Sequence, residues 1–374
     1  MPRAHIVVSS PIVVTSKVLQ LRGIFDVPPS ENVSSEWDVD LPLDERTWNV
    51  GLIVGPSGAG KTTIARELFA DALMKPFEWD KNKAIVDCFD SESIKDVIEL
   101  LSSVGFSSPP SWLKPFHVLS NGEQFRVNIA RALSENKQLT VVDEFTSVVD
   151  RTVAQIGSAA IARTVRKRNQ QFIAATCHYD VIDWLQPDWA FEPHIGKFYW
   201  RDLQRRPAIS LEIKRVSREA WEIFAPHHYL SRTLLITSRC FVAFWNNMPV
   251  AFTAVIYLPH AKLKNSWREH RTVCLPDFQG VGIGNAMSDA IGSLIRGLEG
   301  RYYSRTSAPG MIVSRRRSKN WKTTIIGPCS LQRSGSAKAP KSWTADLVRQ
   351  TVGFEYVGSK MDSKLAWSLW NEKV

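Results

Sequence analysis

The stretch Gly55-Pro-Ser-Gly-Ala-Gly-Lys61-Thr62-Thr63 decides how the first half of this 374-residue chain folds. It follows an apolar run over Val50–Val54 and opens a helix-like run from Thr62 to Leu73, so the pattern predicts a strand, a glycine-rich turn and a helix. In such a turn, backbone N–H groups and the positive end of the helix converge on a phosphate. We therefore expect a nucleotide-binding loop in which Lys61 reaches the β- and γ-phosphates of ATP and Thr62 binds magnesium. The predicted phosphate-binding positions are Gly55, Ser57, Gly58, Gly60, Lys61, Thr62 and Thr63.

Three further segments follow this loop in a fixed order. The first is Leu119-Ser-Asn-Gly-Glu-Gln-Phe-Arg126, the second is the apolar run from Leu139 that ends in Asp143-Glu144, and the third is His178 after a strand over residues 172–176. Together they resemble the motifs of ABC-type ATPases. The usual signature of that family reads Leu-Ser-Gly-Gly-Gln, so Asn121 and Glu123 depart from it.

The resemblance implies a role for each of these residues. Asp143 would hold the magnesium shell, Glu144 would orient or deprotonate the attacking water, and His178 would contact the γ-phosphate. In this family the signature of one protomer completes the site of the other. Ser120 and Gly122 would therefore bind ATP of a second copy, which implies an ATP-dependent homodimer.

Two departures from the family bear on function. Only 59 positions separate Lys61 from Ser120, which leaves little room for the helical subdomain that grips a membrane partner. No glutamine lies in that interval, so Asp87 or Asp90, after an expected strand over residues 84–86, would replace the usual metal-contacting glutamine. We expect slow or gated hydrolysis, with Phe25 as the aromatic that stacks on adenine.

Composition is typical of a globular chain with two or three domains, with 44% hydrophobic and 22% charged residues. No apolar run reaches the roughly 18 residues that span a bilayer, and the first residues lack a signal-peptide pattern, so we expect a cytoplasmic protein. The five cysteines are scattered, which favours reduced thiols over disulfides or zinc ligands. Magnesium is the metal that the motifs imply.

Charge divides the chain into two parts, which we interpret as domains over residues 1–205 and 206–374. Residues 206–374 hold 25 Lys and Arg against 11 Asp and Glu, a net of +14, whereas the first 205 residues carry a net of −4. Such asymmetry indicates an anionic partner, with nucleic acid first and CoA-like phosphates second. A solvated basic surface is the alternative.

The second part begins a new pattern. A strand is predicted over 209–214, a helix over 217–224, and a hairpin over 240–257 with Asn246-Asn247 as its turn. A strand then leads from Arg271 into a glycine turn that opens a helix over 285–298. This turn resembles the pyrophosphate loop of GNAT-type acyltransferases, as does a final strand over 352–356. The matching positions are Gln279, Gly280, Gly282 and Gly284.

The resemblance implies acetyl-CoA or another small molecule as group donor. Backbone N–H groups at a helix start would meet its phosphate oxygens. A dinucleotide-binding motif would need glycine or alanine where Asn285 stands. A plain strand, turn and helix is the remaining alternative. The fold class expected for the whole chain is α/β, a P-loop ABC-type ATPase domain followed by an α+β GNAT-like mixed-sheet domain.

A narrower resemblance covers roughly residues 210–325. The stretch Pro226-His-His228-Tyr229-Leu-Ser-Arg232, the hairpin and the strand at Arg271 resemble the Mom-type branch of the GNAT fold, phage-encoded enzymes that modify adenine in DNA. It implies that His228 and Tyr229 are catalytic, since histidine is the commonest acid or base near neutral pH. A structural loop is the alternative.

Basic and aromatic residues interleave after residue 300, a composition that suits phosphate neutralisation and base stacking. A basic loop with Trp321 in the core is the alternative, and the segment 332–341 is predicted to be a flexible loop. The predicted nucleic-acid contacts are Arg271, Arg315, Arg316, Arg317, Lys319 and Trp321.

Four functions fit these observations. The first is an ATPase module fused to a transferase that modifies a nucleic-acid base, most simply adenine in DNA. The second is an N-acetyltransferase for proteins or small amines with acetyl-CoA. The third is a nucleotide-switched DNA-binding protein whose transferase fold is inactive, because a fold does not guarantee its usual chemistry. The fourth, a transporter ATPase, is disfavoured by the short helical segment and the basic second part.

Overall fold

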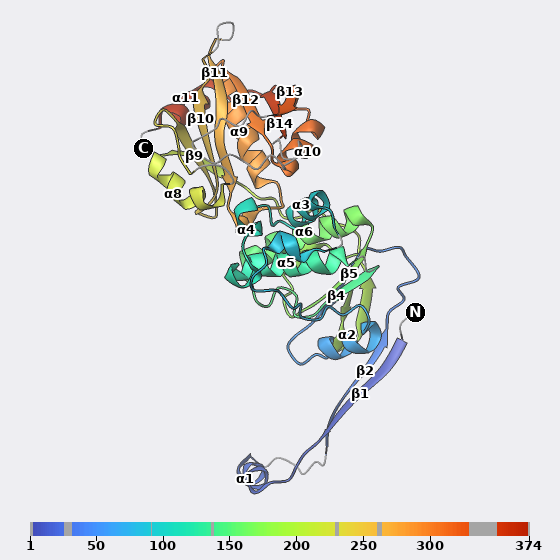
Figure 1. Cartoon of the computed structure of the whole chain (residues 1–374). Helices are drawn as coiled ribbons and strands as arrows, with labels where there is room; N and C mark the ends of the chain where they lie inside the picture. The colour runs from blue at the N-terminus through green and yellow to red at the C-terminus, as the bar shows by residue number, and fades with distance from the viewer. Residues whose placement is uncertain are drawn as a thin grey trace. The chain divides into compact units, whose positions relative to one another are not determined.

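The computed structural model describes residues 3–25, 32–90, 92–135, 138–228, 232–259, 264–328 and 350–372. The chain forms two compact units, and neither is continuous in sequence (Figure 1). The first comprises Met1–Phe77 and Arg131–Arg206, and the second comprises Glu78–Ala130 and Pro207–Val374. The segment 78–130 therefore belongs to the second unit, although it precedes residue 205 in sequence. The predicted domains over 1–205 and 206–374 stay a prediction.

A five-stranded sheet with the order β4-β5-β3-β6-β7 forms the centre of the first unit. Its first four strands are parallel, and β7 pairs antiparallel with β6. All five residues of β3 are buried, as expected for a central parallel strand covered on both faces. The elements are β3 (Val50–Val54), α2 (Lys61–Phe69), β4 (Leu139–Val142), α6 (Arg151–Arg168), β5 (Gln171–Thr176), α7 (Val181–Leu185), β6 (Trp189–Glu192), η3 (Pro193–Ile195) and β7 (Lys197–Trp200).

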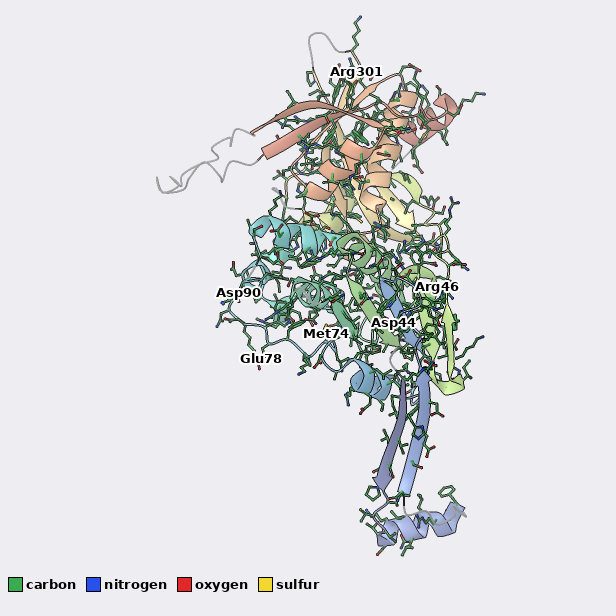
Figure 2. The ribbon with its side chains drawn as sticks, turned by 90° about the vertical axis from the view of Figure 1, so that its right-hand side faces the viewer. Asp44, Arg46, Met74, Glu78, Asp90 and Arg301 are labelled. Atoms are coloured by element: carbon green, nitrogen blue, oxygen red, sulfur yellow. The ribbon has the colours of Figure 1, made fainter. Side chains whose placement is uncertain are left out.

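An antiparallel hairpin precedes this sheet. It consists of β1 (Arg3–Pro11) and β2 (Asn32–Asp40), and α1 (Ser16–Phe25) lies between the two strands in sequence. Only the end of the hairpin near Ile6 and Val39 joins the core, and the side chains of its other end are exposed on both faces (Figure 2). No residue of α1 is buried.

The second unit begins with short helices between the two parts of the first. The expected strand over 84–86 is wrong, because the Asp87 N–H donates to the Ala84 carbonyl oxygen and closes a 3-10 turn. An apolar run of three residues does not distinguish a strand from a helical turn. The elements are η1 (Ile85–Cys88), α3 (Ile94–Ser103), α4 (Pro109–Trp112), η2 (Phe116–Val118) and α5 (Asn121–Ser134), whose last residues belong to the first unit.

A seven-stranded mixed sheet with the order β13-β14-β12-β11-β10-β9-β8 forms the rest of the second unit. The β9–β10 hairpin turns at Asn246 and Asn247, both with positive φ, as a two-residue turn between strands requires. The elements are β8 (Glu212–Val216), η4 (Arg218–Ala220), α8 (Trp221–Phe224), η5 (Ala225–His227), β9 (Arg239–Trp245), β10 (Met248–Tyr257), β11 (Ser266–Cys274), η6 (Pro276–Phe278), α9 (Ile283–Gly297), β12 (Arg301–Thr306), α10 (Pro309–Arg317), β13 (Trp321–Pro328), β14 (Gln350–Tyr356) and α11 (Ser363–Asn371).

The pair β11 and β12 is the one parallel pairing in the described part of this sheet, and α9 connects the two strands. They pair only from Ser266 with Arg301 to Arg268 with Tyr303, although β11 continues for six more residues. The two strands therefore part at their carboxyl ends, beside the start of α9. Within the described ranges, no helix is both long and apolar enough to cross a membrane. The predicted flexible loop over 332–341 lies outside the described residues.

Candidate functional site

A cavity of about 300 Å³ lies at the amino end of α2 in the first unit. It gathers the predicted phosphate loop, the acidic end of β4 and the end of β5, which the parallel sheet brings to one edge. Its lining residues are Trp37, Ser57, Gly58, Gly60, Lys61, Thr62, Thr63, Asp143, Glu144, Ser147, Thr176 and Cys177.

The loop before α2 has the backbone shape of a phosphate site. Gly58 and Gly60 have φ values of 80° and 87°, which other residues rarely adopt, and the space in front of Gly58 is open. The Lys61 ammonium donates to the carbonyl oxygens of Gly55 and Pro56, at 2.8 and 2.7 Å. Phosphate oxygens would replace these carbonyls as acceptors, so the residues present fit a nucleotide.

Trp37 is a lining residue that the sequence reasoning missed. A Cβ atom at Gly60 would lie 2.3 Å from the Trp37 ring, so the indole packs directly against the phosphate loop. Phe25, the aromatic predicted to contact adenine, ends α1 with 70% of its surface exposed and does not line the cavity. The contact of Phe25 with adenine stays a prediction. Trp37 stands at the inner end of an alternating strand, the signal that could have identified it.

The two acidic residues that follow β4 are Asp143, the predicted magnesium ligand, and Glu144, which is predicted to activate the attacking water. Asp143 and Thr62 line the same cavity, and the Asp143 carboxylate accepts from the Glu144 N–H at 2.8 Å. Glu144 is exposed and adopts a positive φ of 50°. One carboxylate and one hydroxyl beside a phosphate loop suit magnesium, which keeps several waters and takes its other ligands from phosphates. Among the described residues, no three His, Cys, Asp or Glu side chains gather as a metal centre.

His178 lies just beyond the end of β5. Its backbone N–H donates to the Thr176 hydroxyl at 3.2 Å, and its neighbour Cys177 lines the cavity. The His178 side chain itself is not among the lining residues. Its predicted contact with the γ-phosphate stays a prediction.

Glu123, which departs from the family pattern, has a structural role at the start of α5. The Ser120 hydroxyl accepts from the Glu123 N–H at 3.3 Å, and the Glu123 carboxylate accepts from the Ser120 N–H at 3.0 Å, which forms a capping box at the start of α5. The same carboxylate, which is buried, accepts from the Ser111 hydroxyl at 2.8 Å. Glutamate at 123 therefore anchors the helix start, while Ser120 stays exposed and Gly122 is buried.

In the second unit, the start of α9 fits the phosphates of a donor such as CoA. Gly280 and Gly282 have φ values of 90° and 97°, and Gly282 caps the 15-residue helix α9. A Cβ atom at Gly282 would meet nothing within 4 Å, so the space before the helix is open. The first N–H groups of a helix lack partners within it and carry partial positive charge. The diverging strands β11 and β12 end beside this start.

Gln279 and Gly284 support this loop from behind. The Gln279 side chain accepts from the Ser107 N–H at 2.6 Å and donates to the Cys274 carbonyl oxygen at 2.8 Å. A Cβ atom at Gly284 would lie 3.6 Å from the Cβ atom of Cys274, so the helix start packs closely on the end of β11. Burial raises the pKa of the Cys274 thiol to about 12. Gln279 therefore fixes the backbone of the loop through its side chain.

The histidine-rich segment is described only in part. His228 is buried, and its ring meets the Trp221 ring edge-on at 5.6 Å. Tyr229 lies outside the described residues. Burial lowers the pKa of His227, which is half-buried. The catalytic roles of His228 and Tyr229 stay predictions.

His270, on β11, was not among the site residues predicted from the sequence. It is the extra residue of a bulge in β11, because Ala254 pairs with Arg271 and Val255 with Glu269. Burial, and then the charges of Arg271 and Arg268, lower the pKa of His270 to about 4. Its imidazole is therefore neutral at physiological pH, and its Nε2 accepts from the Leu235 N–H at 3.4 Å.

Arg315 and Trp321 do not have the exposure that nucleic-acid contacts need, so these two predictions are wrong. Arg315 is 1% exposed, and its guanidinium pairs with the buried Glu269 carboxylate at 2.9 Å and lies 4.2 Å from the Trp321 ring. Trp321 is buried and donates to the Asp289 carboxylate at 2.6 Å. The alternative of a core Trp321 is confirmed. Arg315 lies on α10, which contacts β13, and Trp321 lies on β13, an edge strand of the sheet.

The other predicted nucleic-acid residues differ in exposure. Arg316, Arg317 and Lys319 are exposed around the end of α10. Arg271 is partly buried, and its guanidinium donates to the carbonyl oxygens of His270 and Thr233, at 2.9 and 3.1 Å. Their contact with nucleic acid stays a prediction.

Comparison with known proteins places the similarity of sequence in the ATPase part. No protein-family model matches the chain. Over 133 residues, 30% of this chain and 50% of the relative, it is 29% identical to the zinc import ATP-binding protein ZnuC of Pseudomonas syringae. Over 82 residues, 22% of this chain and 33% of the relative, it is 38% identical to the lipoprotein-releasing system ATP-binding protein LolD 2 of Chlorobium chlorochromatii. The chain thus spans a third to a half of the length of these relatives.

Two kinds of solved structure resemble separate parts of the chain. The dimeric ATP-binding cassette MJ0796 bound to ADP and Pi matches 46% of this chain and 94% of its own, with 14% identity and a TM-score of 0.36. The IAA acetyltransferase from Bacillus cereus matches 39% of this chain and 99% of its own, with 13% identity and a TM-score of 0.32. The chain has an ABC ATPase-like α/β domain and a GNAT-like mixed-sheet domain, the fold class that the sequence predicted.

Proposed function

We propose that this chain is an ATP-gated transferase that moves a group from an acyl-CoA or similar donor to a nucleic-acid base, adenine in DNA. The open, glycine-capped start of α9 beside two diverging strands carries the transferase part of this proposal. The basic excess of residues 206–374 supports a nucleic acid as the acceptor.

The ATPase part acts as the gate. ATP-Mg²⁺ would bind in the cavity of the first unit, with Lys61 on the phosphates and Thr62 and Asp143 on the metal. The exposed Ser120 would meet the γ-phosphate of a second copy, so ATP would hold two chains together as a homodimer. Glu144 would activate the water that ends this state.

An acyl donor supplies a thioester carbon, and this chain's residues orient it and manage one proton. The amine nitrogen of the acceptor forms a bond to that carbon, and the carbon–sulfur bond breaks with its electron pair on sulfur, so the donor leaves as a thiolate. The amine proton passes to a base, and a proton returned to the sulfur gives the free thiol. His228 is the proposed base, and burial lowers the pKa of the adjacent His227. The Gly280–Gly282 backbone would hold the donor phosphates.

The nucleic-acid part is tested by duplex binding as a function of salt. Arg316→Ala/Arg317→Ala should weaken binding and lower the magnitude of the slope of log K against log salt by about 0.9 for each phosphate that is no longer neutralised. Lys214→Ala/Lys364→Ala removes the same charge from exposed positions elsewhere in the unit and serves as the control. Equal slopes for both double variants would remove α10 from the interface, and absence of duplex binding by the unaltered chain would remove DNA as acceptor.

An N-acetyltransferase for proteins or small amines is the second candidate, because the donor site requires no nucleic acid. Calorimetric titration with acetyl-CoA should show binding that Gly282→Trp abolishes, since the indole would fill the open space before α9. Gly310→Ala, a glycine with equally open space and no positive φ, is the control. Binding of acetyl-CoA without affinity for DNA would favour this candidate over the first.

A further inference from the structure

The segment 78–130 lies between the nucleotide-binding motifs in sequence, yet it belongs to the same compact unit as the seven-stranded sheet. Three of its helices contact that fold: α3 contacts α10, α4 contacts η5, and α5 contacts the η6 loop. Helix α5 begins with the ATP signature, and η6 leads directly into the donor loop. The signature and the donor loop are therefore neighbours within one compact unit.

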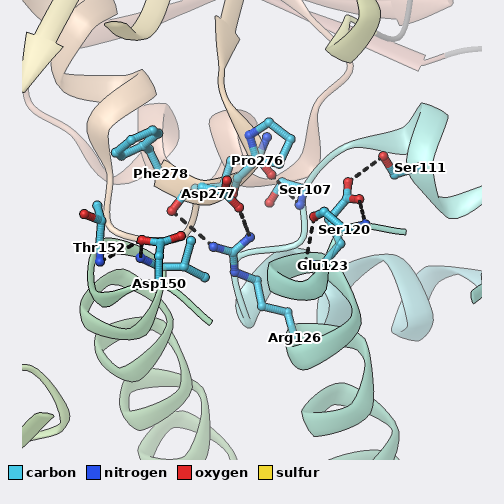
Figure 3. A network of polar contacts seen from close by, with 12 residues as sticks. Ser107, Ser111, Ser120, Glu123, Arg126, Asp150, Thr152, Pro276, Asp277 and Phe278 are labelled. Atoms are coloured by element: carbon cyan, nitrogen blue, oxygen red, sulfur yellow. Dashed lines mark hydrogen bonds and ion pairs between the residues drawn. The ribbon is translucent and has the colours of Figure 1, made fainter. Parts of the chain in front are cut away.

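Arg126 makes the contact between α5 and the η6 loop. Its side chain is completely buried on the second turn of α5. Nη1 donates to the Pro276 carbonyl oxygen at 2.9 Å, Nη2 donates to the Asp277 carbonyl oxygen at 3.1 Å, and the Asp277 carboxylate lies 3.7 Å from Nη1 (Figure 3). A buried guanidinium is costly without such acceptors. These bonds therefore fix the backbone of η6 on the signature helix.

A second contact holds the other end of the same loop. The Ser107 N–H donates to the Gln279 side-chain oxygen at 2.6 Å, and the Gln279 amide donates back to Cys274. The two contacts bracket residues 276–279. Gly280 and Gly282, whose N–H groups would face the donor phosphates, follow at once.

The stretch of α5 between the signature and Arg126 is short, and hydrogen bonds hold its first turn. Ser120 and Arg126 are six residues apart, about 9 Å along a helix axis. The capping box at Glu123 ties the exposed Ser120 to the helix, so the two ends of this stretch move together. A displacement of Ser120 by a bound phosphate would therefore reach the acceptors of Arg126.

We propose that Arg126 is a positioning residue that transmits ATP-dependent closure on the signature to the donor-binding loop. This inference rests on the proposed function, because it requires that the chain binds both ATP and a CoA-class donor. Coupling between two sites is reciprocal. ATP should thus raise the affinity for the donor by the same factor by which the donor raises the affinity for ATP.

The test measures this coupling by calorimetry with acetyl-CoA as probe, with and without ATP-Mg²⁺, on the whole chain carrying Glu144→Gln to prevent turnover. The expected coupling is about 5- to 150-fold. Arg126→Met should reduce it to near onefold, and Arg126→Lys, which keeps the charge but not the two-pronged geometry, should restore part of it. Arg131→Met is the control, because Arg131 lies on the same helix and its guanidinium stacks on the Phe77 ring.

Hydrogen exchange provides a readout that needs no donor. ATP should slow amide exchange at residues 280–284 at least about 5-fold in the parent chain and leave it unchanged in Arg126→Met, if one coupling free energy governs both measurements. Should Arg126→Met fail to fold, Gln279→Met provides the same comparison from the transferase side. Coupling that persists in these variants, or two affinities that are independent in the parent chain, would overturn the inference. Failure of the parent chain to bind either ligand would instead overturn the proposed function.

Discussion

Two consecutive arginines of α10 should have opposite effects when each is replaced by methionine. Arg315 is 1% exposed and pairs with Glu269, whose side chain is 7% exposed. Arg315 also donates to the hydroxyls of Ser304 and Ser288, the latter at 2.7 Å. The next residue, Arg316, is exposed. Arg315→Met should therefore destabilise the fold and leave the intrinsic affinity for DNA unchanged, and Arg316→Met should do the reverse.

The size of the destabilisation follows from the Glu269 carboxylate, which Arg315→Met would leave buried without its partner. Removing one partner of a buried pair costs about 3–5 kcal/mol, because the other charge stays buried without compensation. For a domain of this size that is a fall in melting temperature of about 6–20 °C. A surface substitution such as Arg316→Met should change the free energy of unfolding by no more than about 0.5 kcal/mol.

The pH dependence gives an independent check. Burial alone would raise the pKa of Glu269, but the Arg315 charge and the hydrogen bonds from Ser304, Thr272 and Ser288 outweigh it and hold the pKa below its ordinary value. The stability that the pair contributes is therefore present above the unfolded pKa and is lost as pH falls through the folded pKa. In Arg315→Met the carboxyl can protonate instead, so the difference in stability should narrow from pH 7 to pH 4.

Urea denaturation of the single variants, and of Glu269→Gln/Arg315→Met, measures these differences in the free energy of unfolding. The double variant removes both charges, so it should be more stable than Arg315→Met alone. Duplex binding is measured at a temperature where each variant is folded. A loss of stability below about 1 kcal/mol for Arg315→Met, together with weaker DNA binding, would refute the argument and return Arg315 to the interface.

Three further predictions concern other residues. Because the pKa of His270 is lowered to about 4, the fold favours the neutral imidazole, and stability should fall as the pH drops from 6.5 to 4. Solvent screening of this half-buried ring limits the loss to about 1–2 kcal/mol, and the loss should be absent in His270→Gln. Equal acid denaturation curves for the two chains would contradict this. Trp37→Ala should weaken ATP binding about 10-fold by calorimetry because it removes an aromatic side chain from the site, and Phe25→Ala should leave the affinity unchanged. Weaker binding by Phe25→Ala and not by Trp37→Ala would instead support Phe25 as the aromatic that contacts adenine. Glu144→Gln should accumulate an ATP-dependent dimer in light scattering, and a chain that stays monomeric with ATP would count against the shared site.

The first part of the chain was predictable because its chemistry is local in sequence. The phosphate loop, the strand Val50–Val54 and the acidic pair at Asp143 each carry their own flanking pattern, and the sheet brings them to one edge. Trp37 was missed because its contact with Gly60 depends on how a distant hairpin packs. The alternating pattern of β2 places Trp37 on one face of the strand, but it does not show that this face meets the phosphate loop.

The second part was predictable in topology and less so in exposure. The Asn246-Asn247 hairpin and the glycine turn before α9 were confirmed because turn residues with positive φ leave a clear signal. Arg315 was misplaced because a charged side chain is assumed to be exposed, and its partner Glu269 lies 46 positions earlier. A larger separation, 150 positions, hides the bond of Arg126 to the Pro276 carbonyl oxygen. Contacts of this kind are set by tertiary packing.

Nucleoside mass spectrometry on total DNA tests the central claim most directly. DNA is taken from cells that express the full chain, Gly282→Trp, Glu144→Gln or the control Gly310→Ala. The account predicts a new adenine adduct with the full chain and the control, lost with Gly282→Trp and reduced with Glu144→Gln, and the added mass would identify the transferred group. DNA without any adduct, from cells in which the folded chain is abundant, would contradict the claim that this protein modifies DNA.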